Sequence, residues 1–330
     1  MSRAVWTLRR YVDVHAALLD DRLAPFGVSA RADITHRAVR ESVSRELPPM
    51  LIAQWRQELG ARASEMLAAA PDDRAFDLVV DLAEPWARTA TARLLGLSEV
   101  EVAACIPAAR TVFEESATAT SGEPSLALTQ AASELATRLD GHGGVGTVQS
   151  FVALSHTVPA LVASSLLALL EHPAQLAWLS THANADTLST ATNELLRFAG
   201  PSRALFRTAL VPLEIGEVAI NTGDSVVLLI SEANRDPSRF ADPNRLDVQR
   251  AFSGHLAFGA GAHGCVGASI VRMLLGEAIA AFVTSPRRLT LADVDGTAVT
   301  WLDGFALRAP RRLRHERDAR PSRTSPTPTP

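Results

Sequence analysis

Apolar residues recur at helical spacing through most of the chain. This spacing predicts helices over residues 12–19, 36–47, 48–70, 77–95, 99–139 with a break at 121–124, and 147–170. The last of these ends at Glu171-His-Pro173, because a proline disfavours helical geometry in the residue before it. Helical spacing then resumes as far as Phe198.

Alternating patterns typical of β-strands are few and short. They occur over residues 6–11, 210–220 and 224–229, and a hairpin is expected over 290–307. Residues 311–330 are rich in arginine, serine and proline, a composition that favours disorder. The pattern therefore predicts a mainly α fold with small β-sheets: one domain over residues 1–310, followed by a disordered tail over 311–330.

The composition excludes several classes of protein. The chain has 330 residues, 47% of them hydrophobic, and a formal net charge of -4 without a basic stripe, which argues against a nucleic-acid partner. Ser155, His156, Thr157 and Pro159 interrupt the apolar run 151–170, so a buried core helix is expected rather than a membrane span. The first residues lack the apolar core of a signal peptide, and we expect a cytoplasmic protein.

The segment Phe258-Gly-Ala-Gly-Ala-His-Gly-Cys-Val-Gly267 carries the strongest chemical signal. Its glycines allow tight turns and the close approach of a large flat group. Cys265 directly precedes an apolar run over 268–283 that reads as a helix, and the amide groups at a helix start favour a thiolate that can ligate a metal. Cys105 lies in an apolar helical segment and is expected to be a buried, inert thiol.

The spacing Phe-x-x-Gly-x-x-x-Cys-x-Gly resembles the haem-ligand loop of the cytochrome P450 family, most closely that of its bacterial soluble branch. The resemblance implies a P450-like haem-thiolate fold that binds haem b, with Cys265 as the iron ligand and Phe258, Gly259 and Gly267 shaping the loop. It also implies a set of cations that hold the two haem propionates: His36, Arg40, Arg207 and His263.

Glu194-Leu-Leu-Arg197 places a carboxylate and a guanidinium on one helix face. The family has this Glu-x-x-Arg in the same order, joined by a downstream arginine in a buried network. Arg245 is the motif match for that third residue and Arg250 is its rival. The resemblance implies that this network fixes the loop that presents the thiolate.

The chain also departs from the family's pattern. It begins almost at the first strand, only residues 23–35 separate the first helix from His36, and the region 97–147 is short. These parts usually cover the substrate pocket, so we expect a fold truncated at the N-terminus and in the pocket cover. The distal haem face would then be open, or covered by a partner protein.

A further departure lies where the family's oxygen-activation motif reads Ala-Gly-x-(Asp/Glu)-Thr. Here Ala153-Leu-Ser-His-Thr157 places Leu154 at the glycine and His156 at the acid, while Thr157 is retained. The resemblance implies that Thr157 and His156 manage protons. Three interpretations of His156 stay open: a replacement acid–base group, including one suited to peroxide; a structural histidine bonded to a neighbouring carbonyl; or a direct iron ligand.

The resemblance implies a monooxygenase that hydroxylates, or similarly oxidises, a small organic molecule in specialised metabolism. Electrons would come from a ferredoxin and its reductase, docking near Arg37, Arg45 and Arg272. Arg203 is the one obvious charged candidate in an otherwise apolar pocket wall. Two alternatives remain: peroxide-driven or redox-neutral chemistry on the same haem, and a non-catalytic haem-binding accessory protein.

Overall fold

The computed structural model describes residues 4–25, 49–70, 76–120, 124–141, 147–251, 254–286, 289–291 and 298–317. Its α-helices are α1 (Tyr11–Leu19), α3 (Pro49–Ala68), α4 (Glu84–Leu95), α5 (Glu99–Thr118), α6 (Leu126–Arg138), α7 (Thr147–Val152), α8 (Val158–Glu171), α9 (Pro173–His182), α10 (Ala185–Ala199), α11 (Ile230–Ala233) and α12 (Ala268–Thr284). Two π-helical segments, η1 (Leu78–Ala83) and η2 (Ala153–Thr157), and a 3-10 turn, η3 (Gly261–His263), complete the helical part.

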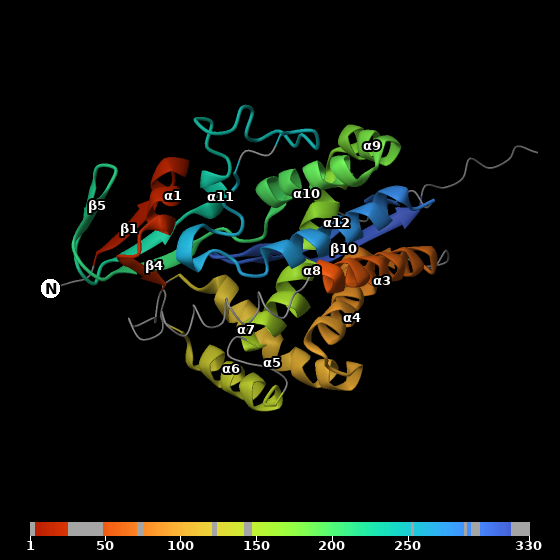
Figure 1. Cartoon of the computed structure of the whole chain (residues 1–330), viewed down its shortest axis with the longest axis horizontal. Coiled ribbons are helices and arrows are strands. Elements are labelled where there is room, and N and C mark those ends of the chain that lie inside the picture. Colours follow the sequence, from red (N-terminus) through yellow and green to blue (C-terminus); the bar gives the residue numbers. More distant parts are fainter. Residues whose placement is uncertain are drawn as a thin grey trace, which may run out of the picture.

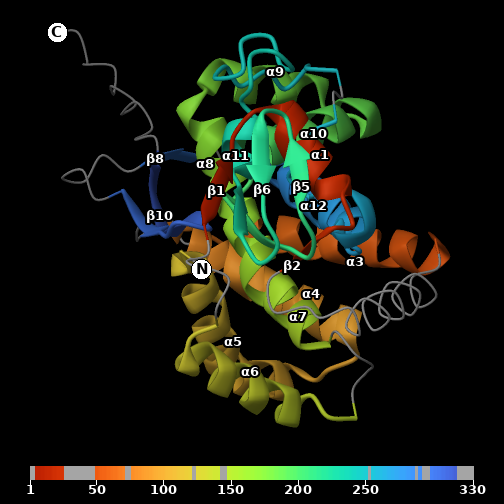
Figure 2. The same ribbon diagram turned by 90° about the vertical axis from the view of Figure 1, so that its left-hand side faces the viewer.

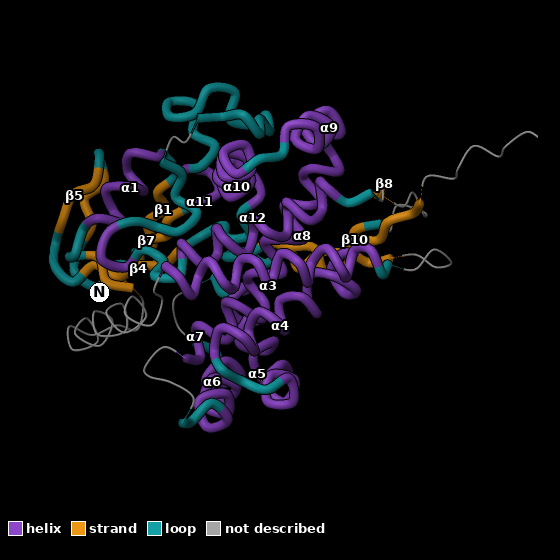
Figure 3. The backbone as a smooth tube through the Cα atoms, turned by 45° about the vertical axis from the view of Figure 1, so that its right-hand side comes forward, coloured by secondary structure: helices purple, strands orange, loops and turns teal. Residues whose placement is uncertain are grey.

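The strands form small sheets at opposite sides of this helical body (Figure 3). On one side, β1 (Val5–Leu8), β7 (Ser225–Leu228), β4 (Leu205–Ala209) and β2 (Leu23–Pro25) pair in that order. A separate hairpin, β5 (Leu213–Ile215) with β6 (Val218–Ile220), lies on the same side (Figure 2). On the other side, β3 (Phe76–Asp77), β8 (Leu289–Leu291) and β9 (Val299–Asp303) each pair with β10 (Arg308–Arg317).

Helix α8 runs through the centre of the fold (Figure 1) and contacts α10, α12, η1 and β10. Nearly all its residues from Val158 to Leu169 are buried, because its sequence is apolar on every face. Within the described residues, one helical stretch, Val148–Glu171, is long and apolar enough to cross a membrane, with a mean hydropathy of 1.7. About two thirds of that window, 67%, is buried inside the protein, as expected for a core helix.

The predicted class is confirmed, and local sequence signals account for the ends of several helices. Ser98 begins α5 with a capping box, since its hydroxyl accepts from the Glu101 amide while the Glu101 carboxylate accepts from the Ser98 amide. Gly96 ends α4 in the left-handed conformation, with φ of 65°. Cys105 is buried as predicted, and burial raises the pKa of its thiol. The helix expected over 36–47 lies outside the described residues.

Three expectations about element boundaries are wrong. Residues 205–209 form strand β4, which pairs with β7 and β2, so Arg207 lies within a strand that the pattern over 210–220 and 224–229 did not include. Residues 311–317 belong to β10 and pair with β3, β8 and β9, so the chain is ordered past the expected tail boundary at residue 311. The expected helix over 77–95 begins with a strand residue and a π-helical segment, because Asp77 accepts hydrogen bonds from the amides of Val79 and Val80.

Candidate functional site

Cys265 is presented by a tightly folded loop at the start of α12. Its amide donates to the carbonyl of Phe258 at 2.8 Å, and the Gly259 amide donates to Leu256 at 2.9 Å. Gly259 and Gly261 both adopt φ of 67°, a conformation that disfavours any residue with a side chain. The Cys265 thiol is exposed and forms no disulfide, and helix α12 begins three residues later at Ala268. The positive end of a helix macrodipole therefore lies beside the thiol.

The loop packs against α1, and this contact leaves no room for a side chain at Gly261. A Cβ built there would lie 2.7 Å from the backbone oxygen of Leu18 and 3.2 Å from the Cα of Leu19. Because backbone atoms cannot move aside as a flexible side chain can, the glycine is needed for close packing as well as for its φ angle. Helix α1 therefore packs against the cysteine loop at Gly261 and supports it.

The predicted Glu194–Arg197 pair is present and almost fully enclosed. Both side chains are 1% exposed, and Arg197 donates to the two carboxylate oxygens through Nε at 2.7 Å and Nη2 at 2.8 Å. Arg197 Nη1 donates to the carbonyls of Asn234 and Pro243, each at 2.9 Å. Such a buried pair is sustained by hydrogen bonds that satisfy its remaining polar atoms.

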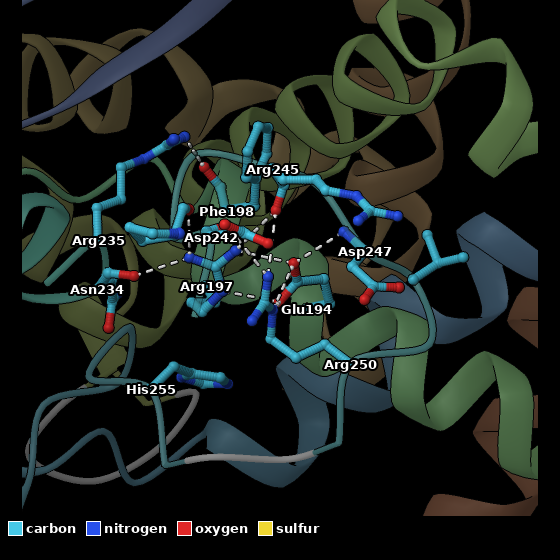
Figure 4. Close-up of polar contacts among 12 residues, drawn as sticks. Glu194, Arg197, Phe198, Asn234, Arg235, Asp242, Arg245, Asp247, Arg250 and His255 are labelled. Carbon is cyan, nitrogen blue, oxygen red and sulfur yellow. Dashed lines mark hydrogen bonds and ion pairs between the residues drawn. The ribbon is translucent and has the colours of Figure 1, made fainter. Parts of the chain in front are cut away.

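The third cation of the network is Arg250, and the expectation that the side chain of Arg245 supplies it is wrong. Arg250 Nε donates to Glu194 at 3.2 Å, and its other nitrogens donate to backbone carbonyls that include Ala241. Arg245 contributes only its carbonyl, which accepts from Arg197 at 3.3 Å, while its exposed side chain points away from Glu194 (Figure 4). The turn over 242–245 directs the Arg245 backbone inward, so its guanidinium faces outward.

Asn234 connects this network to the cysteine loop. Its carbonyl accepts from Arg197, and its side-chain oxygen accepts from the buried Leu256 amide at 2.7 Å. The carbonyl of Leu256 in turn accepts from Gly259. A continuous chain of hydrogen bonds therefore runs from Glu194 to the turn that precedes Cys265, which gives the expected loop-fixing role a physical route. Sequence reasoning missed Asn234, because its role depends on a contact between segments distant in sequence.

Arg207 is a buried cation with no carboxylate partner among the described residues. It is 6% exposed, its Nη1 donates to the carbonyl of Phe206 at 2.9 Å, and burial lowers its pKa to about 10. A charge buried in this way calls for a nearby anion. Haem b carries two propionates, so Arg207, together with an exposed thiol in a glycine-lined loop, fits that cofactor.

The other expected propionate contacts are only partly placed. His263 lies in η3, two residues before Cys265, and is partly buried. His36 and Arg40 lie outside the described residues, as do Arg37 and Arg45. Of the four expected propionate contacts, Arg207 and His263 are therefore the two that lie within the described residues.

His156 lies in the π-helical segment η2 and faces helix α5. Its ring is 5.6 Å from the ring of Phe113, centroid to centroid, and burial lowers its pKa to about 4, with the positive charges of Arg110 and Arg88 adding to the effect. Leu154, two residues earlier on the helix, belongs instead to the main core that also contains residues of α12. His156 thus faces Phe113 and not the core that contains α12, which argues against the interpretation in which it is a direct iron ligand.

The hydrogen bond to Ser155 determines which ring nitrogen of His156 carries the proton. The Ser155 hydroxyl donates to the carbonyl of Phe151 at 2.7 Å, so its single hydrogen is already used. His156 Nδ1 lies 2.8 Å from the same oxygen and must therefore be the donor. Neutral His156 then carries its proton on Nδ1 and leaves Nε2 as an acceptor. Sequence reasoning missed this role of Ser155, although the adjacent Ser-His pair was visible.

A polar cavity of about 380 Å³ opens beside His156. Its lining includes Arg110 and Glu114 of α5 and Arg311 of β10. Arg311 and Glu114 form an ion pair at 3.0 Å across this cavity. The family's motif has a carboxylate at the position of residue 156. Here a neutral imidazole takes its place, beside a cavity lined by charged side chains. Thr157, the next residue, is partly buried at the end of η2.

Two further arginines singled out from the sequence are engaged within the protein. Arg272 lies 4.6 Å above the ring of Phe258 and donates to Asn193 at 3.2 Å, so it supports the cysteine loop. Arg203 donates to Asp303 at 2.7 Å and to the carbonyl of Gly304 at 3.0 Å. Both guanidinium groups are therefore held by contacts within the protein.

Comparisons with known proteins agree with this arrangement. The family model "Cytochrome P450" matches residues 179–285, which contain both the Glu-x-x-Arg pair and the cysteine loop. The chain is 33% identical over 316 residues to the cytochrome P450 monooxygenase PikC of Streptomyces venezuelae, covering 86% of this chain and 75% of that protein. It is 27% identical over 359 residues to the cyclomarin C epoxidase CymV of Salinispora arenicola, covering 94% and 90%.

Other matches are partial or concern the fold alone. The biotin biosynthesis cytochrome P450 of Bacillus subtilis is 38% identical over 144 residues, which span 36% of that protein. Among solved structures, a mutant of P450 EryK in complex with erythromycin B superimposes with a TM-score of 0.80 at 24% identity, covering 97% of this chain and 93% of that one. The fold is therefore shared even where the sequences have diverged.

Proposed function

The chain belongs to the cytochrome P450 family of haem-thiolate monooxygenases, and from this premise we propose that it oxidises a small organic molecule of specialised metabolism. The observation that carries the proposal is the exposed Cys265 thiol at the start of α12, in a loop tied by Asn234 to the buried Glu194–Arg197 pair. Relatives whose names state an epoxidase or a hydroxylase activity support an oxygen-inserting reaction.

In this proposal Cys265 ligates the iron of haem b, and Arg207 and His263, with His36 and Arg40, hold its propionates. The haem supplies activation of dioxygen for insertion into the substrate when it is bound. Phe258, Gly259 and Gly267 shape the loop around the sulfur, and Glu194, Arg197 and Arg250 keep that loop in place. Substituting any of these supporting residues should weaken haem binding more than it changes the rate of substrate oxidation.

We further propose that His156 and Thr157 manage protons. In this proposal the acceptor Nε2 of neutral His156 takes up a proton from the polar cavity and returns it there, while the Nδ1 proton stays in its hydrogen bond to Ser155. The Ser155 oxygen holds the ring in the orientation that points Nε2 away from Ser155. The neutral charge of this group distinguishes the site from one with a carboxylate at the same position.

Electrons are proposed to come from a ferredoxin and its reductase in the cytoplasm. Arg272 is bound to Asn193 and Phe258, so its contribution to docking would be indirect, by fixing the surface near the thiolate. A peroxide-driven reaction is the second candidate. One observation favours it: residues 153–157 contain no carboxylate, and His156 is the acid–base group in their place.

The test is reconstitution of the haem-loaded protein with ferredoxin, ferredoxin reductase and reduced nicotinamide. Compounds that shift the Soret band are first selected as ligands of the haem pocket, and their oxidation is then followed by mass spectrometry. Product formation that requires ferredoxin, and that is lost in Cys265→Ser but kept in Cys105→Ser, supports the proposal. Product formed with hydrogen peroxide alone, at a rate that ferredoxin does not increase, would replace it with the second candidate.

A further inference from the structure

We propose that this protein has a second small-molecule site, separate from the cysteine loop, that binds planar aromatic carboxylates. The site is a surface cavity of about 690 Å³, a volume within the usual range of small-ligand pockets. Its walls come from the second half of α8, the end of α10, the segment 231–237 that includes part of α11, the β9–β10 hairpin, and Arg9 and Arg10. No residue of 258–267 or of 153–157 lines it.

One wall of this cavity carries an arginine stacked on a tryptophan. The Arg308 guanidinium lies 3.7 Å from the ring centroid of Trp301, and the two residues sit on neighbouring, paired strands. The Arg308 side chain is 40% exposed, and its Nε lies 3.6 Å from Asp303 Oδ1 without a hydrogen-bond partner among the described residues. Stacking therefore holds the guanidinium flat while leaving donors available to a carboxylate.

A second arginine–aromatic stack lines the same cavity. Arg235 lies 4.2 Å above the ring of Phe198 and donates to the Phe198 carbonyl at 2.9 Å and to the side chain of Asn244 at 3.1 Å. Both acceptors are neutral, and burial lowers the pKa of Arg235, with repulsion from Arg197 adding to the effect. Arg235 is thus a half-buried cation without a carboxylate partner among the described residues.

The lining carries five arginines, Arg9, Arg10, Arg203, Arg235 and Arg308, and three carboxylates, Glu171, Glu232 and Asp236. Glu232 is paired with Arg9 at 3.0 Å. Asp303, beside the cavity, accepts from Arg203 at 2.7 Å and lies 3.6 Å from Arg308 Nε, so one acid is divided between two guanidinium groups. A ligand carboxylate would offset the excess of positive charge in the lining. Leu167, Ala168 and Pro201 add apolar surface to the same cavity, which suits a flat hydrocarbon body better than inorganic phosphate.

The chemistry therefore selects a ligand with one carboxylate and a flat aromatic ring. The carboxylate would accept hydrogen bonds from Arg308 or Arg235, and the ring would stack on a guanidinium face or lie over the apolar residues.

The test uses 2-naphthoate as the probe and its neutral counterpart 2-naphthamide as the matched ligand control. Each is titrated by calorimetry into the haem-loaded protein while the Soret absorbance is recorded. We expect 2-naphthoate to bind at one site, at least about tenfold more tightly than the amide, with the Soret band unchanged, because a charged hydrogen bond is worth that factor. Arg308→Gln and Arg235→Gln should each lower the affinity for 2-naphthoate by about tenfold.

Arg22→Gln serves as the control variant, because Arg22 is exposed and paired with Asp20 far from the cavity. It should leave the affinity for 2-naphthoate unchanged. Equal affinities for the two probes, no binding at millimolar concentration, or full affinity in both cavity variants would overturn the proposal. So would binding that shifts the Soret band, since the ligand would then occupy the haem pocket. The two-probe comparison on the unaltered protein stands even if a variant fails to fold.

Discussion

At the scale of single residues, the site depends on polar groups whose environment fixes their protonation. His156 is held neutral by burial and by the charges of Arg110 and Arg88, with its pKa lowered to about 4. His255, next to the cysteine loop, is buried to 9% exposure, and burial lowers its pKa to about 4 as well. Both imidazoles therefore stay uncharged at neutral pH.

This neutrality predicts that the protein loses stability in mild acid. Because the folded pKa lies below the ordinary value of 6.5, the unfolded chain takes up more protons between about pH 6.5 and 4. The free energy of unfolding should thus fall as the pH drops through that window, by up to about 1.4 kcal/mol per pH unit for each histidine. Urea denaturation at pH 7, 6 and 5 measures the slope.

His156→Gln should make the free energy of unfolding depend less steeply on pH. The dependence that remains should be the part due to His255. The matched control is His182→Gln, because His182 is exposed at the end of α9. If the free energy of unfolding of His156→Gln changes with pH as steeply as that of the unaltered protein, His156 is not held neutral by its surroundings. The proposed role of His156 in managing protons then loses its basis.

The Glu194–Arg197 pair gives a second prediction at this scale. Glu194→Gln would leave Arg197 and Arg250 facing a neutral amide in a site that is 1% exposed. Breaking a buried pair in this way costs about 3–5 kcal/mol, so we expect a loss of that order in the free energy of unfolding, with weaker haem retention. Arg245→Gln is the control, since only its backbone carbonyl joins the network, and a loss as large as that of Glu194→Gln would contradict the assignment.

At the scale of elements, the cysteine loop is held by its fit against α1. Gly261→Ala should destabilise the loop and lower haem retention, because its Cβ would meet the Leu18 carbonyl at 2.7 Å in addition to the strain of φ 67°. Gly96→Ala is the matched control: its φ of 65° is nearly the same, but no atom lies within 4 Å of the added Cβ. It carries only the conformational penalty, of about 1 kcal/mol.

Haem content after gel filtration and urea denaturation distinguish the two variants. We expect Gly261→Ala to be the less stable of the pair and the one that loses haem. Equal behaviour would mean that the contact with α1 does not support the loop, and that only the left-handed backbone matters at Gly261.

The elements also show what local sequence can predict. Helices with strong local signals, such as α5 with its capping box, were predictable because their stabilising contacts lie within a few residues. Strand β4 was missed because it is short and lies between β7 and β2, and β2 (Leu23–Pro25) is distant from it in sequence. The π-helical segment η2 could not be foreseen either, since its apolar pattern reads as ordinary helix.

At the scale of the whole molecule, the family resemblance rested on short motifs whose residues the fold brings together. Cys265 and the Glu194–Arg197 pair belong to such motifs, and the structure joins them through Asn234. The third cation was ambiguous from spacing alone, because either Arg245 or Arg250 lies close enough in sequence. The two cavities, beside His156 and between α8 and the β9–β10 hairpin, arise only from tertiary packing and leave no sequence pattern.

The central claim is that Cys265 ligates haem iron as a thiolate, with the opposite side of the iron open to a ligand. The absorbance spectrum of the haem-loaded protein, reduced and exposed to carbon monoxide, tests it most directly. We predict a strongly red-shifted Soret band that Cys265→Ser abolishes and Cys105→Ser retains. A Soret band that does not shift, or a red-shifted band that survives Cys265→Ser, would contradict the account.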